Sequence, residues 1–307
     1  MKRKTRSSKK ESKFSVSIVI PNLNGEKLIE KNFPKVQEAW DNPKNGIMEV
    51  VIVDDGSWDN SISFIKSKFP QVKLIKHKVN RGFSASVNTG VRAAKGDLIL
   101  LLNTDVLPES NFLEPVLPHF SDPRVFAVSV HERGYGSAKG NFRDGYIGLE
   151  MGEESKESHP SFYVSGGSGV FRRSVWVELG GMDEKLLSPF YWEDIDLCYR
   201  AWKRGYINLW EPGGKVVHNH ESTISKFPKE YVQRVRERNQ LLCIWKNISS
   251  SNLIRKHIIG LLSRTFRHPG YLRIIIMAMA RFGQAMKARR KEIKESKVSD
   301  EAIFARF

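Results

Sequence analysis

Acidic side chains follow two strongly apolar segments of this sequence, and such side chains can bind cations. Asp54 and Asp55 come directly after 48–53, and Asp105 follows 98–102. A carboxylate at the end of a buried strand is costly unless it meets a cation or hydrogen-bond donors. Converging oxygen ligands of this kind suit Mg²⁺ or Mn²⁺. For any single residue, a turn or a helix N-cap is the alternative interpretation.

A third acidic segment, Glu193-Asp194, begins a predicted helix over 193–204. The helix dipole favours acids in a first turn, so a purely structural role is one interpretation. Asp196 points away from Asp194 on the same helix. We expect Asp196 to pair with Arg200, which lies four residues later.

Two histidines, His218 and His220, follow the short apolar segment 216–217. A lone histidine is more often a surface or core residue than a ligand. If 218–220 is extended, the two rings point to opposite sides, so at most one of them faces a site. We expect that one to be His218.

The elements that must position these side chains alternate along the first third of the chain. Apolar strands are predicted at 14–20, 48–53, 72–77 and 98–102, with helices at 25–40, 60–69 and 84–94 between them. This order predicts an α/β fold with a mainly parallel sheet covered by helices on both faces. Ligands of such sheets bind beyond the carboxyl ends of the strands. Polar or turn-forming residues follow each predicted strand there: Pro21, Asn22, Asp54, Asp55, Asn80, Arg81, Asn103, Thr104 and Asp105.

The rest of the chain is less regular. The segment 134–160 is polar and glycine-rich and is expected to be a loop, 163–171 is strand-like, and 206–210 is a predicted strand. From about residue 226 the pattern changes to basic amphipathic helices over 231–246, 253–267 and 272–297. We therefore expect a disordered basic N-terminus at 1–13, a catalytic domain at 14–225 and a basic helical region at 226–307.

The charge of the chain is concentrated at its ends. The 307 residues carry a net charge of +16, of which +6 lies in 1–13 and +14 in 226–297, whereas 14–225 carries −3. A basic terminus attracts nucleic acid or an anionic membrane surface alike. Two cysteines cannot form a disulfide framework, and no secretory signal or membrane-length apolar run is found.

The ordered motifs of the chain resemble those of family 2 glycosyltransferases with the GT-A fold, over residues 15–225. The resemblance is closest to the branch that contains rhamnosyltransferase-like enzymes of cell-surface polysaccharide synthesis. It rests on seven segments: IVIPNLNG (18–25), VIVDDGSWDN (51–60), NRGFSASVNTGV (80–91), GDLILLLNTDV (96–106), GGMDEKLL (180–187), WEDIDLCYRAWKRGY (192–206) and VVHNHES (216–222).

The resemblance implies a site for a nucleotide-diphospho-sugar donor. Asp54 or Asp55 would accept a hydrogen bond from the base or ribose, and Arg81 could lie near the phosphates. The wall, sugar side and floor of that site would involve Pro21, Asn22, Asn103, Thr104 and Gly167. Trp192 would stack on a sugar ring, although core packing is equally expected.

The resemblance also implies an inverting, metal-dependent transfer to a hydroxyl. Asp194 would be the general base, with Glu193 positioning substrate or the loop. Asp105 and His218 would bind Mg²⁺ or Mn²⁺. The family motif at this point is Asp-x-Asp, but here Asn103 takes the first position, which leaves Asp105 as the anionic ligand. We do not expect this to abolish activity.

Several alternatives accompany this interpretation. The acceptor would be a glycan or a lipid-linked molecule, and the C-terminal helices would attach the protein to the inner, cytoplasmic face of the membrane through anionic lipid. Those helices could instead pack on the core or on a second subunit. A non-catalytic basic protein that binds membrane or nucleic acid would leave the acidic motifs without a purpose. Nucleotidyl transfer is a further alternative, but the glycine-rich, arginine-containing loop that is expected after the first strand of such enzymes is missing from this sequence.

Overall fold

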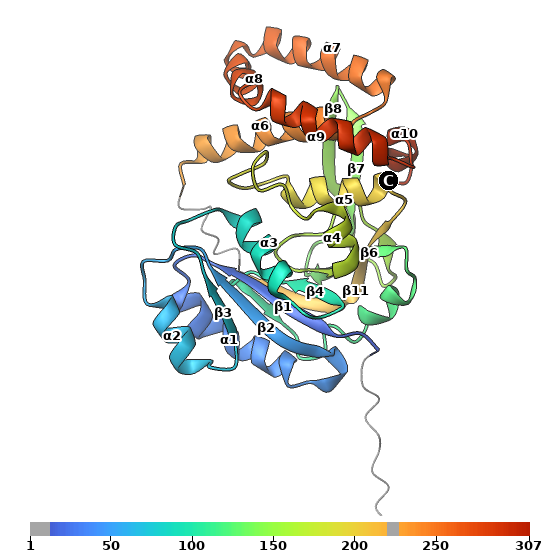
Figure 1. The fold of residues 1–307 in the computed structure, drawn as a ribbon. Helices are drawn as coiled ribbons and strands as arrows, with labels where there is room; N and C mark the ends of the chain where they lie inside the picture. The colour runs from blue at the N-terminus through green and yellow to red at the C-terminus, as the bar shows by residue number, and fades with distance from the viewer. Residues whose placement is uncertain (1–12, 220–226) are drawn as a thin grey trace, which may run out of the picture.

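The computed structural model describes residues 13–219 and 227–307 (Figure 1). The disorder predicted for the N-terminus, the side chain of His220 and the boundary predicted at residue 225 lie outside these ranges.

One mixed sheet forms the centre of the described chain, in the order β3-β2-β1-β4-β10-β6-β11-β5, with β9 beside β11. The first four strands in this order are parallel, as predicted, and β6 and β11 are also parallel. An antiparallel strand, β10, lies between β4 and β6, and it occupies the end of the segment 163–171 that was expected to be strand-like. The strands span Val16–Asn22 (β1), Ile47–Asp54 (β2), Lys73–Lys76 (β3), Leu98–Leu101 (β4), Val106–Pro108 (β5), Val125–Glu132 (β6), His159–Pro160 (β9), Gly169–Arg172 (β10) and Ile207–His218 (β11).

Helices cover both faces of this sheet because its central strands are apolar on both sides. In β1, Ile18 and Ile20 face one core, and Val19 between them faces another. The first core is closed by α1 (Glu26–Trp40) and α2 (Ser61–Lys68), and the second by α3 (Phe83–Ala93), α4 (Arg173–Leu179) and α5 (Glu193–Lys203). Short 3₁₀ turns occupy Pro43–Asn45 and Leu117–Ser121. The predicted α/β architecture is therefore confirmed.

Three local expectations differ from the structure. The segment 134–160 is not simply a loop, because it contains a hairpin of β7 (Ala138–Arg143) and β8 (Tyr146–Met151). Its turn, Asp144-Gly145, has positive φ at both residues, which is the backbone that a tight hairpin needs. The helix expected over 272–297 divides at residues 280–281 into α8 (Leu272–Met279) and α9 (Phe282–Glu295). Helix α1 is continuous over Glu26–Trp40 although it contains Pro34, and a proline inside a helix predicts a local irregularity.

The C-terminal helices pack against the rest of the protein. They are α6 (Lys229–Asn247), α7 (Ser251–Arg267), α8, α9 and α10 (Asp300–Phe304), with a 3₁₀ turn at Pro269–Tyr271. A third core joins Tyr199 and Trp202 of α5 to Leu241 and Leu242 of α6. Figure 1 shows these helices stacked beyond α5, at the end of the molecule away from β2 and β3. The structure therefore shows that these helices pack on the core of the same chain, which was one of the alternatives for this region.

Candidate active site

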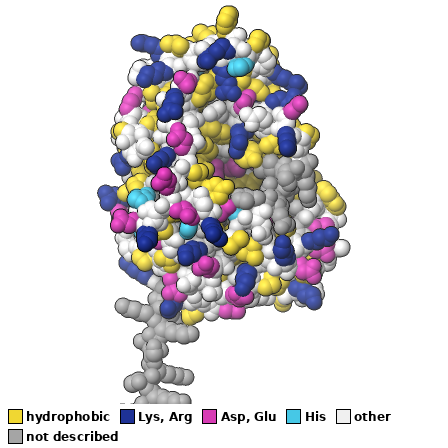
Figure 2. All heavy atoms as spheres, turned by 180° about the vertical axis from the view of Figure 1, so that it is seen from behind, with side chains coloured by type: hydrophobic (Ala, Val, Ile, Leu, Met, Phe, Trp, Pro, Cys, Tyr) yellow, Lys and Arg dark blue, Asp and Glu magenta, His cyan; other side chains and the backbone are white. Residues whose placement is uncertain are grey.

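A cavity of about 330 Å³ opens beyond the carboxyl ends of β1, β2 and β4, where the sequence predicted a ligand site. Figure 2, which views the molecule from the side opposite to Figure 1, shows a hollow near its middle. Residues from the strand ends, from the loops around 80 and 165, and from the segment before α5 line it. They are Pro21, Asn22, Leu23, Asn24, Leu28, Asp55, Asn80, Gly82, Phe83, Ser86, Asn103, Thr104, Asp105, Ser165, Gly166, Gly167, Pro189, Phe190, Tyr191, Glu193, Asp194 and Phe227.

The two adjacent acids after β2 have different surroundings. Asp54 is fully buried behind the cavity lining and accepts hydrogen bonds from Asn22 Nδ2 (2.9 Å) and the Ser57 backbone N–H (3.0 Å). Asp55 lines the cavity. Asp54 therefore joins the ends of β1 and β2, whereas Asp55 is the one of the pair that can meet a ligand.

Asp55 is itself held firmly in place. Its carboxylate accepts hydrogen bonds from the backbone N–H groups of Arg81 (2.9 Å) and Gly82 (2.8 Å), and His77 Nδ1 lies 2.7 Å from Oδ1. The Arg81 side chain points elsewhere, with its guanidinium 3.2 Å from Glu184. Arg81 is absent from the residues that line the cavity, within the part of the chain that is described. Its contribution to the site is its backbone.

Asp105 and His218 are brought together by strand pairing. Strand β11 pairs antiparallel with β5 so that His218 lies opposite Val106, and the Asn219 backbone N–H donates to the Asp105 carbonyl at 3.1 Å. His218 Nε2 is consequently 3.3 Å from Asp105 Oδ2. The other ring nitrogen, Nδ1, is 3.3 Å from Glu132 Oε2, an acid at the end of β6 that the sequence reasoning missed.

The electrostatics of this group favour a cation. Burial opposes a charge on His218, but the hydrogen bond and charge of Asp105, together with the charge of Glu132, outweigh it and raise the pKa of His218. A divalent metal can take the place of that proton. Within residues 13–219 and 227–307, no set of three or more acidic, histidine or cysteine side chains is arranged around a single metal position. One carboxylate and one imidazole fit a metal that completes its coordination with substrate phosphates and water.

Asn103 and Gly167 form the floor beside Asp105. The Asn103 backbone N–H donates to the Gly167 carbonyl at 2.9 Å. A Cβ on Gly167 would lie 2.7 Å from Asn103 Nδ2, so a larger residue here would displace the Asn103 side chain. The predicted sugar-side residues Asn103, Thr104 and Gly167 thus line the cavity together with Pro21 and Asn22.

The acidic pair at the start of α5 enters the same cavity. Asp194 accepts hydrogen bonds from the backbone N–H groups of Gly166 (3.2 Å) and Ile195 (2.8 Å). Glu193 is 7% exposed, and its Oε2 has no hydrogen-bond partner among the described residues. Burial raises the pKa of both carboxyl groups, and the charge of Asp194 adds to the effect on Glu193. Both are therefore readier to hold a proton than ordinary surface acids.

The backbone before this pair is strained. Tyr191 and Trp192 have φ values of 69° and 75°, a region that non-glycine residues rarely occupy and that is common at functional sites. The strain turns Tyr191 toward the cavity and Trp192 into the third core, where it is 5% exposed. Of the two roles expected for Trp192, the structure places it in core packing.

Helix α6 holds this strained segment, a role that was not predicted from the sequence. The side-chain amide of Asn239, which is fully buried, donates to the carbonyls of Leu187 (2.5 Å), Phe190 (2.9 Å) and Tyr191 (2.9 Å). The guanidinium of Arg236 lies 4.7 Å from the centre of the Tyr191 ring. A polar residue at a core-facing position of a helix is the only signal that could have pointed to Asn239.

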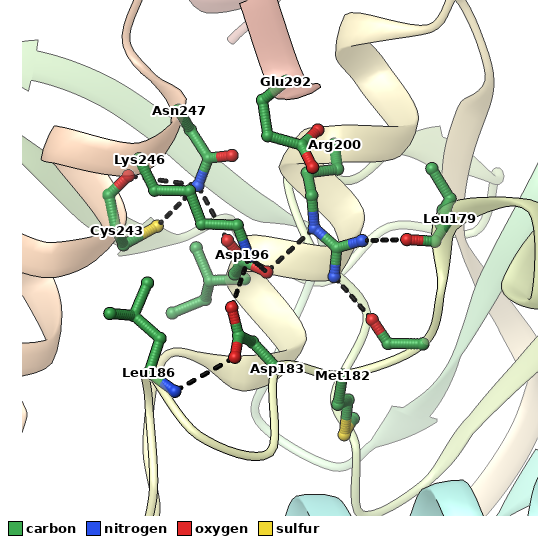
Figure 3. Close-up of polar contacts among 12 residues, drawn as sticks. Leu179, Met182, Asp183, Leu186, Asp196, Arg200, Cys243, Lys246, Asn247 and Glu292 are labelled. Atoms are coloured by element: carbon green, nitrogen blue, oxygen red, sulfur yellow. Dashed lines mark hydrogen bonds and ion pairs between the residues drawn. The ribbon is translucent and has the colours of Figure 1, made fainter. Parts of the chain in front are cut away.

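Asp196 of α5 also anchors this helix to α6, through the contacts that Figure 3 shows. Asp196 is fully buried and binds Arg200 Nε at 2.9 Å, which confirms the predicted pairing four residues apart. It also accepts from Lys246 Nζ (3.0 Å) and Asn247 Nδ2 (2.8 Å) of α6. Burial disfavours the charged carboxylate, but Arg200 and Lys246 outweigh burial and lower the pKa of Asp196 to about 2.

Comparison with known proteins places this site in context. Residues 17–180 match the family described as Glycosyl transferase family 2. The pre-mycofactocin glycosyltransferase of Mycobacterium tuberculosis is 30% identical over 185 residues, covering 58% of this chain and 38% of the relative. This chain thus spans well under two thirds of that relative's length.

Two further proteins support the comparison. The N-acetylglucosaminyl-diphospho-decaprenol L-rhamnosyltransferase of M. tuberculosis is 23% identical over 220 residues, covering 60% of this chain and 71% of that protein. The crystal structure of GalNAc-T7 with UDP, GalNAc and Mn²⁺ superposes with a TM-score of 0.64 at 17% identity, covering 84% of this chain and 57% of that one. The second similarity shows a shared fold.

Proposed function

Since the chain belongs to glycosyl transferase family 2, we propose that it transfers a sugar from a nucleotide-diphospho-sugar to a hydroxyl of a glycan or lipid-linked acceptor, in the synthesis of a cell-surface polysaccharide. One observation carries this proposal: Asp55, Asp105 and Asp194, which follow or begin three separate elements, line a single cavity. Asp55 and Asn22 would contact the nucleotide, and Asn103, Thr104 and Gly167 would contact the sugar.

The transfer would invert the anomeric carbon in one displacement. The acceptor oxygen forms a bond to the anomeric carbon as the bond from that carbon to the diphosphate oxygen breaks, and the diphosphate leaves with the electron pair. Asp194 accepts the proton of the acceptor hydroxyl. The raised pKa of Asp194 makes it a stronger base near neutral pH than an ordinary aspartate. Glu193 would orient the acceptor.

A divalent cation, Mg²⁺ or Mn²⁺, would be held by Asp105 and His218. When bound, it would act as a Lewis acid that stabilises charge on the leaving diphosphate. The Mn²⁺ in the crystal structure of GalNAc-T7, a protein of the same fold, supports this assignment. Asn103 leaves the site with one negative charge fewer than a second aspartate would provide.

The acceptor would enter past aromatic side chains. Phe190, Tyr191 and Phe227 line the cavity, and ring faces of this kind suit the apolar faces of sugars. None of the described helices has the length and apolar content needed to cross a membrane. We place the enzyme at the inner face of the cell membrane. The non-catalytic alternative is not favoured, because it gives the acidic cavity no purpose, and nucleic acid is not an expected partner.

Substitution of Asp194 tests the base assignment. The Asp194→Asn protein is expected to lose sugar transfer by about 100- to 10,000-fold, the usual contribution of a general base. Donor binding should persist in this variant. It is measured by thermal shift with nucleotide diphosphates and their sugars in the presence of Mn²⁺. Asp144→Asn, on the β7–β8 turn, removes an exposed carboxylate outside the cavity and serves as the control. Turnover by Asp194→Asn at the unmodified rate would refute the assignment. No thermal response to any donor would refute the function.

A further inference from the structure

Helices α7 and α8 present large apolar side chains to solvent. Phe266 is 88% exposed, Leu262 68%, Ile259 62% and Ile276 61%. Monomeric proteins seldom leave a row of large apolar side chains uncovered unless a partner binds it. We name this surface the α7–α8 face; it comprises Ile258, Ile259, Leu262, Phe266, Leu272, Ile276 and Met279.

The spacing shows that this face is a second apolar side of each helix. Ile258, Leu262 and Phe266 recur every four residues and form one stripe of α7. The opposite side of α7 carries Leu253 and His257, which are buried, and His257 Nδ1 lies 2.7 Å from the carbonyl of Gly145 in the β7–β8 turn. Packing on the protein therefore uses one side of the helix and leaves the apolar stripe outside.

The same arrangement recurs in α8. Ile274 and Ala278 are buried against the protein, whereas Leu272, Ile276 and Met279 are half exposed or more. Figure 1 places α7 and α8 together at one end of the molecule, and that end carries hydrophobic and Lys/Arg side chains side by side in Figure 2.

The two helices of this face carry charged side chains of a single sign. Residues 251–291 contain ten Lys and Arg and no Asp or Glu. Arg255, Lys256, Arg267 and Arg273, on the two helices that form the face, are exposed. An apolar stripe flanked by cations suits the boundary between headgroups and acyl chains of an anionic bilayer.

We propose that the α7–α8 face docks the protein on an anionic lipid bilayer, with the apolar side chains inserted among the acyl chains and the cations at the phosphates. A symmetric dimer through this face would set the same cations against each other, because a two-fold axis pairs a patch with itself. Anionic lipid neutralises those charges instead. Docking is independent of the proposed transfer and needs no sugar donor.

Vesicle flotation of the full chain tests this docking. We expect the protein to float with vesicles of phosphatidylcholine and phosphatidylglycerol, and to float weakly with phosphatidylcholine alone. The variant Ile259→Gln/Leu262→Gln/Phe266→Gln alters only exposed side chains and should reduce binding by at least about tenfold, since three large apolar side chains would no longer be buried among the acyl chains. The control Met48→Gln/Val177→Gln changes exposed apolar residues on β2 and α4 and should bind normally.

A charge variant separates the electrostatic contribution. Arg255→Gln/Lys256→Gln/Arg267→Gln should weaken binding to anionic vesicles by about fivefold for each charge removed, and added salt should weaken the unmodified protein likewise. Failure of the unmodified protein to float, or equal flotation on neutral vesicles, would overturn the proposal. So would a dimer, seen by sedimentation, that the triple glutamine variant abolishes. Thermal response to nucleotide is retained in all variants, so failure here is distinguishable from failure of the proposed function.

Discussion

Asp105, after β4, and His218, at the end of β11, form the proposed metal site. Asn103 changes the charge of this site without removing it. Asp105 is the carboxylate that lies 3.3 Å from His218, whereas Asn103 two residues earlier contributes a neutral amide to the floor. We expect the two positions to differ in importance. A metal needs the anionic oxygen, but the sugar side needs only a hydrogen-bonding group.

Metal titration distinguishes these two positions. Asp105→Ala should abolish activity at every concentration of Mn²⁺ or Mg²⁺, because it removes the carboxylate that we propose as the anionic metal ligand. Asn103→Asp should keep activity or change the preferred metal, since it restores the Asp-x-Asp pattern. Asp41→Ala, at the exposed residue that follows α1, controls for loss of a carboxylate. Full activity of Asp105→Ala in the presence of a chelator would contradict the ligand assignment.

The pH dependence of transfer follows from the acid pair. Burial raises the pKa of Asp194, and a general base works only when ionised. The rate should therefore fall as the pH drops below that raised value, at a pH above the ordinary aspartate pKa of about 3.9. Because Asp194 and Glu193 are adjacent, the acidic limb of the pH–rate profile reports the titration of the two carboxyl groups together. The check is kcat against pH, and a rate that stays level down to pH ~4 would contradict it.

At the level of elements, the base is positioned by two helices that are distant in sequence. Helix α5 begins with the acid pair, and α6 holds the segment before it through Asn239. This segment contains the two residues with positive φ, so it needs outside support to keep its conformation. Asn239 is thus a positioning residue for Asp194 and does not touch the reacting atoms.

Comparison of two asparagines of α6 tests this role. Asn239→Ala and Asn247→Ala each remove a buried side-chain amide and should each cost about 1–3 kcal/mol of stability. Only Asn239→Ala should lower kcat, with the KM for the donor unchanged, at a temperature where both proteins are folded. Asn247 serves as the control because its amide binds Asp196 and Cys243 instead of the segment. Equal kcat values for the two variants would show that Asn239 is merely structural.

At the level of the whole molecule, the C-terminal helices are part of the structure that carries the site. Their apolar residues share a core with α5, and Lys246 of α6 bridges Asp196 and Asp183 at 3.0 Å each. These contacts join the region that we expect to meet the membrane to the helix that carries the base. The basic charge at this end of the chain thus belongs to a folded region with two apolar sides.

Loss of Lys246 should weaken this junction. Lys246→Met leaves Asp196 with Arg200 and Asn247, so we expect a cost of about 2–3 kcal/mol at neutral pH, below that of a fully unpaired buried charge. The depressed pKa of Asp196 contributes stability above its unfolded value of about 3.9 that is lost as the pH falls toward about 2. The difference between the two proteins should shrink in that range. Urea unfolding measures it, with the exposed Lys185→Met as the control; equal stabilities would contradict the network's role.

The sequence alone indicated the family, the first four parallel strands, the acids at their carboxyl ends and the pairing of Asp196 with Arg200. These features are local, because apolar runs, turn residues and a four-residue spacing each act within a few residues of the chain. Only the tertiary structure decided that Asp55 meets the cavity while Asp54 lies behind it, and that Glu132 joins His218. It also decided that Asn239 supports the segment before Asp194. Such contacts depend on strand register and helix packing between segments far apart in the chain, which local patterns do not encode.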